Sequence, residues 1–511
     1  MELQKNVKHG ELPFLEKDIR NLFTKVKRIL EVDDMKNLLE YMKSSKEENP
    51  LFQYAYTIDG ENKMENLFWS HAKSFDWYQK YGDVVVFHTT YKVNAYDMPC
   101  GIFVGVDNHG KTIMFGCALL RNETTTTFKW LMKTFVGIMK KSPKTIITDQ
   151  DPWMSEAIAV EMPSTKHSFC IWHITSKFSS WFVALLRDNY QAWCQDFYLL
   201  YKMTDPNEFE ENWPLIVGKY DLQDNKHIQG LYKIRFFWAP AYLHEHFFGG
   251  MVTTGRSESI NAFIKRFVSS NISLTEFVEQ VDIGIEDINQ QHIHLNLTAS
   301  LRPTSLKTKS PLEEQVFGMF TPYAFKKFQQ ELTRATLYSL IHMEGDEFMV
   351  RYYKGEDKRS HKFWGILCRH ILRVLFHEDC FKIPSSYLPL RWCCDALQAA
   401  TTTTQEVVVE EILSLEEIIP HSNASIGEVL HPPQSKTKGR PKNKREKGGK
   451  EVARKQTKSC SICSQPGHTK PTCPHKENLC SGNDTNDGVS QKKQKKSSES
   501  LGLNPVFTLK V

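Results

Sequence analysis

The feature that most constrains the fold is a set of short apolar segments in the first third of the chain. Three of them are rich in β-branched and aromatic residues and occupy residues 83–87, 101–105 and 112–116. Segments of this length and composition are typical of β-strands, and the turn signal Asp-Asn-His-Gly at residues 107–110 separates the second from the third. The pattern predicts three antiparallel strands in series.

A helix, a further strand and a second helix are predicted next. A run of four threonines at residues 124–127 can cap a helix, and the apolar residues after it recur at helical spacing. These residues are Phe128, Leu131, Met132 and Phe135. Residues 144–148 have the pattern of a short buried strand that ends at Asp149, and residues 154–162 have that of a helix. The predicted order is β-β-β-α-β-α.

This order of elements is that of an RNase H-like nuclease core, so the sequence predicts an α/β fold. We assign the core to residues 51–300, with a mainly helical insertion in its second half, where residues 256–268 carry the clearest helical pattern. Residues 1–50 show helical patterning without a self-sufficient core. Towards the C-terminus we predict a linker at 401–456, acidic and then basic, and a disordered basic tail at 477–511.

Composition narrows the class of protein. Hydrophobic residues make up 40% of the 511-residue chain and aromatic residues 12%, which is enough for buried cores and argues against wholesale disorder. The N-terminal residues lack the apolar segment of a secretory signal, and no run approaches the ~20 apolar residues that a membrane-spanning helix needs. The 12 cysteines are therefore expected to be reduced thiols or metal ligands, with zinc as the cofactor.

The positive charge is concentrated near the C-terminus. The formal net charge is +5, but residues 436–456 hold ten Lys or Arg against two Glu, a local +8. This concentration favours a polyanion partner, DNA in particular, over a merely solvated face. One basic motif here resembles an AT-hook, whose arginine enters a narrow minor groove, and equally a nuclear import signal, for which residues 492–496 are a second candidate. The motif consists of Lys438, Gly439, Arg440, Pro441 and Lys442.

The sharpest motif lies within residues 457–476, where four metal-binding side chains follow a Cys-x2-Cys-x4-His-x4-Cys spacing. They are Cys460, Cys463, His468 and Cys473. Three thiolates and one imidazole suit tetrahedral Zn²⁺, so the spacing predicts a CCHC zinc knuckle. As the only complete four-ligand set in the sequence, it is expected to hold one tightly bound zinc. Such knuckles usually bind single-stranded nucleic acid, although some serve as protein contacts or local staples.

An RNase H-like nuclease needs carboxylates at the ends of two strands and on a later helix, where they bind two Mg²⁺ ions for phosphoryl transfer. This chain has His88, Asp149 and Glu258 at those positions. An imidazole is a poor ligand for Mg²⁺, and Asp83 lies five residues before His88, at the other end of the strand. We therefore predict that the protein is not an enzyme and that these three positions are vestigial. Asp149 and Glu258 also have ordinary interpretations, as a helix cap and as a carboxylate near a helix start.

Several strings carry a resemblance to a known family. Residues 82–91 read GDVVVFHTTY and are followed by Asn94 and Met98-Pro99. Further matching strings occupy residues 147–151, 170–173, 256–261 and 365–370. Over roughly residues 10–475 the chain resembles the far-red impaired response related family, plant transcription regulators derived from Mutator-like transposases. The resemblance implies a nuclear regulator with a SWIM-type zinc finger after the nuclease-like domain.

The chain departs from the family pattern in three ways. The family's first strand ends in Asp where this chain has His88. The family's SWIM finger is Cys-x-Cys followed by Cys-x-His, and only Cys368 and His370 of that pattern are present. We therefore expect residues 301–400 to be a degenerate SWIM-type region, metal-free or weakly metal-bound, although three nearby cysteines could complete a site: Cys380, Cys393 and Cys394. The family's N-terminal zinc-binding, DNA-binding domain is expected to be missing, which makes this an N-terminally truncated member.

A last pair of residues has two interpretations. Cys170 and His173 lie three residues apart, and they are either half of a zinc site or two core residues.

The sequence thus predicts a nuclear, zinc-binding, DNA-associated transcription regulator without catalytic activity. One alternative is an interaction protein that pairs with full-length relatives, or with a second copy, without site-specific DNA binding of its own. Another is a residual transposase or nuclease. No membrane and no small-molecule substrate is expected as a partner.

Overall fold

The structure of the chain is a computed structural model. It describes residues 33–90, 94–251, 255, 272–301, 305–342, 347–352, 365–394, 429–433 and 508–510. All of these residues belong to one compact unit. The zinc knuckle, the basic motif at 438–442 and Glu258 were predicted from the sequence and lie outside the described residues.

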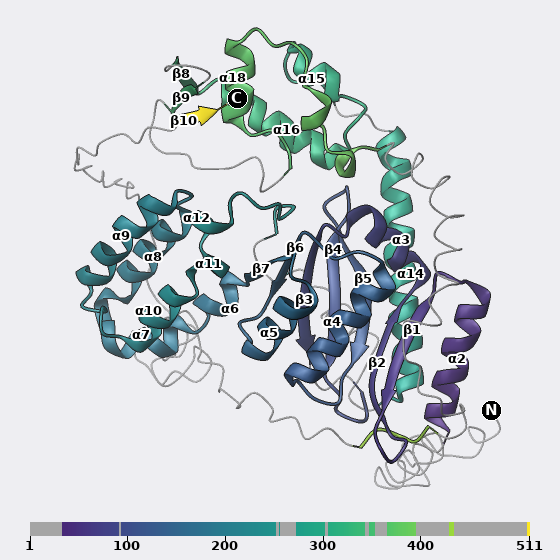
Figure 1. Ribbon diagram of the computed structural model, residues 1–511. Coiled ribbons are helices and arrows are strands. Elements are labelled where there is room, and N and C mark those ends of the chain that lie inside the picture. The colour runs from purple at the N-terminus through teal and green to yellow at the C-terminus, as the bar shows by residue number, and fades with distance from the viewer. Residues whose placement is uncertain are drawn as a thin grey trace, which may run out of the picture. The chain divides into compact units, whose positions relative to one another are not determined.

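A seven-stranded sheet dominates the described residues of the first third of the chain (Figure 1). Its strand order is β1-β2-β5-β4-β3-β6-β7. Neighbouring strands from β1 to β3 are antiparallel, whereas β6 and β7 extend the sheet as parallel strands beside β3. The strands are β1 (Gln53–Ile58), β2 (Met64–Ser70), β3 (Val84–Thr90), β4 (Cys100–Val106), β5 (Thr112–Leu119), β6 (Thr145–Thr148) and β7 (Lys166–Phe169). The predicted antiparallel series is confirmed as β3, β4 and β5, and the predicted fourth strand as β6.

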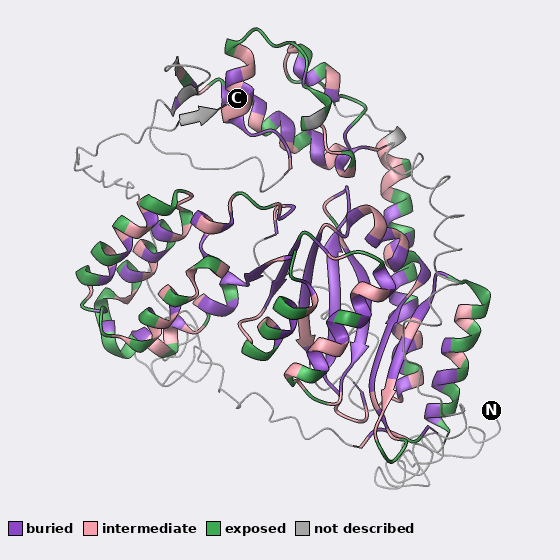
Figure 2. Cartoon of the chain, in the orientation of Figure 1, coloured by how far each residue is buried: buried purple, intermediate pink, exposed green. Residues whose placement is uncertain are grey.

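Helices cover both faces of this sheet, which explains why the central strands β4 and β5 are nearly continuous apolar runs. Side chains alternate along a strand, so neighbouring residues of β2 face opposite ways. The ring of Phe68 contacts Phe135 of α4 (Thr125–Met139), and Trp69 contacts Phe277 of α14 (Leu274–Leu301). Phe103 of β4 also stacks on Phe135, with 4.1 Å between ring centroids. Figure 2 shows that the strands of this sheet are mostly buried.

The helices beside the sheet begin at capping side chains. Thr124 accepts a hydrogen bond from the backbone N–H of Thr127 at the start of α4, as predicted. At the start of α5 (Pro152–Glu161), Asp151 accepts the backbone N–H of Met154. Asp151 is therefore the cap of this helix, and the interpretation of Asp149 as its cap was wrong. Asp149 lies two residues too early to reach the free N–H groups of the first turn.

Two further helices pack beside the sheet. α3 (Ala72–Tyr81) places Tyr78 between Phe115 of β5 and Phe135 of α4, at centroid distances of 5.1 and 5.2 Å. α2 (Asp34–Glu48) packs along α14, and the buried carboxylate of Asp34 accepts the backbone N–H groups of Leu274 and Thr275. These hydrogen bonds cap α14 from a residue about 240 positions earlier in the chain.

A group of helices follows β7, in agreement with the predicted helical insertion. Its own core is rich in aromatic side chains, with Trp193, Phe197, Phe209 and Trp238 fully buried. The most strongly predicted helix, at residues 256–268, lies outside the described residues. The helices of this group are α6 (Ile171–Thr175), α7 (Phe178–Leu186), α8 (Tyr190–Lys202), α9 (Pro206–Lys219), α10 (Lys226–Lys233), α11 (Arg235–Trp238) and α12 (Pro240–Leu243), with the short 3-10 helix η1 (Arg187–Asn189).

Residues 305–394, in their described parts, have another core, which includes Phe328, Leu372 and Trp392. Its helices are α15 (Pro311–Val316), α16 (Pro322–Ala335), α18 (Arg369–His377), η2 (Ser385–Tyr387) and η3 (Leu390–Trp392). Beside them is a small antiparallel sheet of β8 (Tyr338–His342), β9 (Glu347–Tyr352) and β10 (Thr508–Lys510), in the order β10-β9-β8.

Two segments differ from the disorder and linker that the sequence predicted. In the predicted tail, residues 508–510 pair with β9, because the run VFTLKV at the C-terminus is β-prone amid polar residues. In the predicted linker, Leu430 bridges to Lys63 at the end of the β1–β2 hairpin, and Val429 is buried. Among the described helices, none combines the length and apolar character that crossing a membrane requires.

Candidate functional site

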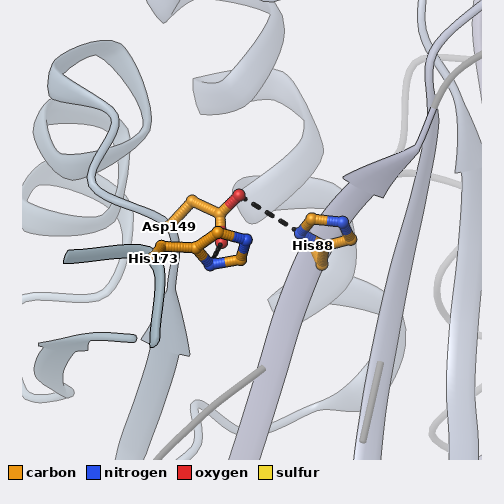
Figure 3. Close-up of side chains that lie close together, drawn as sticks. All are labelled: His88, Asp149 and His173. Atoms are coloured by element: carbon orange, nitrogen blue, oxygen red, sulfur yellow. Dashed lines mark ion pairs between the residues drawn. The ribbon is translucent and has the colours of Figure 1, made fainter. Parts of the chain in front are cut away.

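Three side chains meet where the parallel part of the sheet ends. β3, β6 and β7 are neighbours, and the carboxyl ends of parallel strands lie at the same edge of a sheet. His88 lies near the end of β3, Asp149 directly follows β6, and His173 lies in α6, a few residues after β7. Val86 pairs with Ile147, so the same register two residues later places His88 beside Asp149. The topology of the sheet thus brings the three residues together (Figure 3).

Asp149 lies between the two imidazoles. Its Oδ2 atom is 3.2 Å from Nδ1 of His88, and its Oδ1 atom is 2.5 Å from Nδ1 of His173. The two imidazole rings are nearly parallel, with 5.6 Å between their centroids. One ligand atom from each residue can be chosen so that all three lie within 4.8 Å of one another. Among the described residues, this is the only group of three or more His, Cys, Asp or Glu side chains close enough to hold a metal ion.

Burial and charge set the protonation of this group. Burial raises the pKa of Asp149, but the interactions with His173 and His88 outweigh it and lower that pKa below its usual range. Burial lowers the pKa of His173, yet its contacts with Asp149 and Cys170 raise that pKa to about 9. At neutral pH and without a metal, an ionised carboxylate therefore faces a protonated imidazole. The site is only partly closed, because the side chain of Asp149 is 32% exposed.

Comparison with known families adds a second line of evidence. Residues 84–177 match the MULE transposase domain, a range that begins with β3, ends just after α6 and contains all three residues of the site. Residues 1–30 match the FAR1 HTH-like domain. The residue pattern of that segment predicted helices but no such domain, and the segment lies outside the described residues.

Comparison with individual proteins points to the same family as the domain matches. The chain is 41% identical to Protein FAR1-RELATED SEQUENCE 11 of Arabidopsis thaliana over 410 residues. This alignment covers 77% of the chain and 60% of the relative. The chain is 35% identical over 433 residues to Putative protein FAR1-RELATED SEQUENCE 10 of the same plant, covering 62% of it. Protein FAR-RED IMPAIRED RESPONSE 1, also of Arabidopsis thaliana, is 31% identical over 388 residues and 47% covered. The chain is a homologue of the FAR1-related proteins. It spans about three fifths of the length of the first two of these relatives.

The predicted nuclease core connected His88 and Asp149, and the structure adds His173. The sequence had placed His173 with Cys170, as half of a zinc site or as a core residue. In the structure Cys170 is buried at the residue before α6 and contacts His173, while His173 directs Nδ1 towards Asp149. Both side chains are buried, as the core alternative predicts, and a zinc site that includes them stays a prediction. The missed signal is that each residue of the site lies at, or a few residues after, the carboxyl end of one of three neighbouring parallel strands.

Other predicted site residues of this FAR1-related chain lie elsewhere. Cys368 and His370 are at the start of α18, with 3.8 Å between Sγ and Nδ1, and the described residues offer them no third and fourth ligand in one group. Cys393 is buried in the core of the 305–394 segment, and Cys380 is exposed. Asp83 precedes β3 and forms an ion pair with Arg391, so it does not replace the missing carboxylate at His88.

Proposed function

We propose that this FAR1-related chain is a nuclear, DNA-associated transcription regulator that descends from a Mutator-like transposase and does not cut DNA. The observation that carries the proposal is the contact between His88 and Asp149. In an RNase H-like nuclease the ends of these neighbouring strands hold carboxylates for two Mg²⁺ ions. The strand order around β3, β4, β5 and β6 supports an RNase H-like core, and an imidazole stands at one of its two strand-end positions.

The donor set at this site does not fit the Mg²⁺ pair of a nuclease. Mg²⁺ prefers octahedral oxygen ligands, and a two-metal centre needs several carboxylates to bridge and balance both ions. The described residues supply one carboxylate, Asp149, and it already faces two imidazoles. We therefore derive no phosphoryl-transfer step for this chain.

Association with DNA is supported by features outside the catalytic position. The FAR1 HTH-like match at residues 1–30 and the basic segment at 436–456 are both suited to contacts with nucleic acid. The predicted knuckle, with zinc on Cys460, Cys463, His468 and Cys473, would add a contact to single strands. The basic motif at 438–442 is the proposed signal for nuclear import.

A cleavage assay tests the absence of nuclease activity. The full chain is incubated with supercoiled plasmid in Mg²⁺ or Mn²⁺, next to Asp149→Ala and His88→Asp variants of matched folding. We expect no nicking by the unmodified chain. Metal-dependent nicking that disappears in Asp149→Ala would overturn the proposal, because it would make Asp149 a working ligand.

A binding assay tests association with DNA. Sequences selected by the chain and scrambled versions of them are compared at one stated salt concentration, because phosphate contacts alone give no sequence preference. We expect tighter binding to the selected sequences. Equal affinity for both would favour the alternative, an interaction protein without site-specific DNA binding. Replacing Lys438, Arg440 and Lys442 by Gln should shift a fluorescent fusion from nucleus to cytoplasm.

A further inference from the structure

We propose that His88, Asp149 and His173 bind one Zn²⁺ ion, at the position where a nuclease of this fold would hold Mg²⁺. This inference goes beyond the proposed function and does not depend on it. It rests on the chemistry of the three donors, on their distances and on their burial.

The donor chemistry separates zinc from magnesium. Two imidazole nitrogens and one carboxylate oxygen form a ligand set of the kind that zinc accepts when a fourth position stays open. Imidazole suits Zn²⁺ and its neighbours in the transition series, whereas Mg²⁺ takes oxygen ligands and keeps its waters. A histidine at position 88, in place of the carboxylate of a nuclease, therefore changes which metal the site selects. It does not have to abolish metal binding.

The three donors lie close enough to reach a single ion after small side-chain rotations, since one ligand atom of each lies within 4.8 Å of the other two. Zinc bonds to nitrogen and oxygen of 2.0–2.1 Å in a tetrahedron place neighbouring donor atoms about 3.3 Å apart. Asp149 Oδ2 and His88 Nδ1 are already 3.2 Å apart. The 2.5 Å contact between Asp149 Oδ1 and His173 Nδ1 must open, which a rotation of the carboxylate can achieve.

Two donor atoms of the group, Nδ1 of His88 and Oδ1 of Asp149, are buried. Each lies in an ion pair, but among the described residues neither has a hydrogen bond of good geometry. Buried polar atoms of this kind normally have a partner, and three donors that converge on one point offer a place for a cation. The Cys170 thiol contacts His173 from outside the group, as an outer partner that orients a ligand does.

Access to the site is open on one side. The side chain of Asp149 is 32% exposed, while that of His173 is 7% exposed. A zinc ion with three protein ligands would thus keep its fourth position towards solvent, where water or a group from a bound partner completes the tetrahedron.

The test uses the full chain with Cys460→Ser and Cys463→Ser, so that zinc on the predicted knuckle does not interfere. After loading with ZnSO₄ and dialysis, elemental analysis should find one equivalent of zinc, and X-ray absorption should show nitrogen and oxygen donors only. In this background, Zn²⁺ should also raise the Tm. A further His88→Gln or His173→Gln substitution should abolish both the bound zinc and this rise in Tm. His377→Gln is the matched control, since this exposed histidine lies outside the group.

The outcomes decide the proposal. The proposal is overturned if both His88→Gln and His173→Gln retain the zinc. It is also overturned if the chain with only Cys460→Ser and Cys463→Ser binds no zinc. Asp149 would then belong to an ion-pair cluster without a metal. If His173→Gln fails to unfold cooperatively, His88→Gln and Asp149→Asn decide alone. An excess of Mg²⁺ should not displace the zinc, and displacement would also count against the site.

Discussion

The hydroxyl group of Tyr41 donates a hydrogen bond of 2.9 Å to the carboxylate of Asp282, across the contact between α2 and α14. Asp282 is buried, and burial raises its pKa to about 7, although the hydrogen bond from Tyr41 acts in the opposite direction. A carboxyl group that titrates near neutral pH inside a helix pair makes stability depend on pH.

The first prediction concerns this dependence. The pKa of Asp282 rises from 3.8 to about 7 on folding, so between these pH values the folded chain binds more protons than the unfolded chain. Its free energy of unfolding therefore falls as the pH rises through this window and levels off above it. The full effect is on the order of 4 kcal/mol at most. Urea titrations between pH 4 and pH 8 measure it, and Asp282→Asn should flatten the curve and stabilise the chain at pH 8.

The exposed Glu276 on the same helix provides the control for this prediction. Glu276→Gln should leave the pH dependence as it is in the parent chain. An unchanged slope in Asp282→Asn would show that another group titrates.

The second prediction concerns the core of the sheet. Phe103 is fully buried and contacts three other rings, Phe135 at 4.1 Å, Phe87 at 4.5 Å and Phe68 at 6.0 Å between centroids. Phe103→Ala should lower the free energy of unfolding by about 3–5 kcal/mol, because it removes buried area and leaves a cavity. Leu215→Ala, at a side chain that is 69% exposed, should change it by less than about 0.5 kcal/mol. Chemical denaturation compares the two, and similar losses would argue against this core.

The sequence predicts some elements of this fold and not others for physical reasons. β3, β4 and β5 are dense in β-branched or aromatic residues and separated by clear turn signals, so local pattern suffices. β7 is short and reads KHSF, which has no distinctive periodicity, and β1 and β2 mix polar with apolar residues. These strands can be recognised only from their pairing with the rest of the sheet in the structure.

The candidate site, too, could be predicted only in part from local sequence patterns. His88 and Asp149 could be selected because each ends a predicted strand. His173 appeared only beside Cys170, its neighbour in sequence. Its contact with Asp149 depends on β7 lying next to β6, a long-range pairing that no local pattern reports.

The third prediction concerns the buried pair that joins α16 to α18. Arg369 donates to Glu331 through Nε and Nη2, each at 2.7 Å, and through its backbone N–H at 3.1 Å. Removing one partner of a buried pair leaves the other charge uncompensated, so Glu331→Gln should destabilise this segment by about 3–5 kcal/mol. Glu314→Gln, at an exposed position of α15, is the control. Hydrogen exchange of α18 measures the loss, and equal protection in both variants would contradict the prediction.

The last prediction concerns the zinc that the sequence assigns to residues 457–476. Three thiolates and one imidazole at this spacing form a complete tetrahedral set, so the purified chain should lose about one equivalent of zinc in Cys463→Ser. Cys368→Ser is the informative comparison, because Cys368 has His370 at 3.8 Å but no complete ligand set among the described residues. Its zinc content should equal that of the parent chain. Elemental analysis of the three proteins, purified side by side, gives the count. A loss in Cys368→Ser would mean that Cys380, Cys393 or Cys394 completes a site there, and an unchanged count in Cys463→Ser would reject the knuckle.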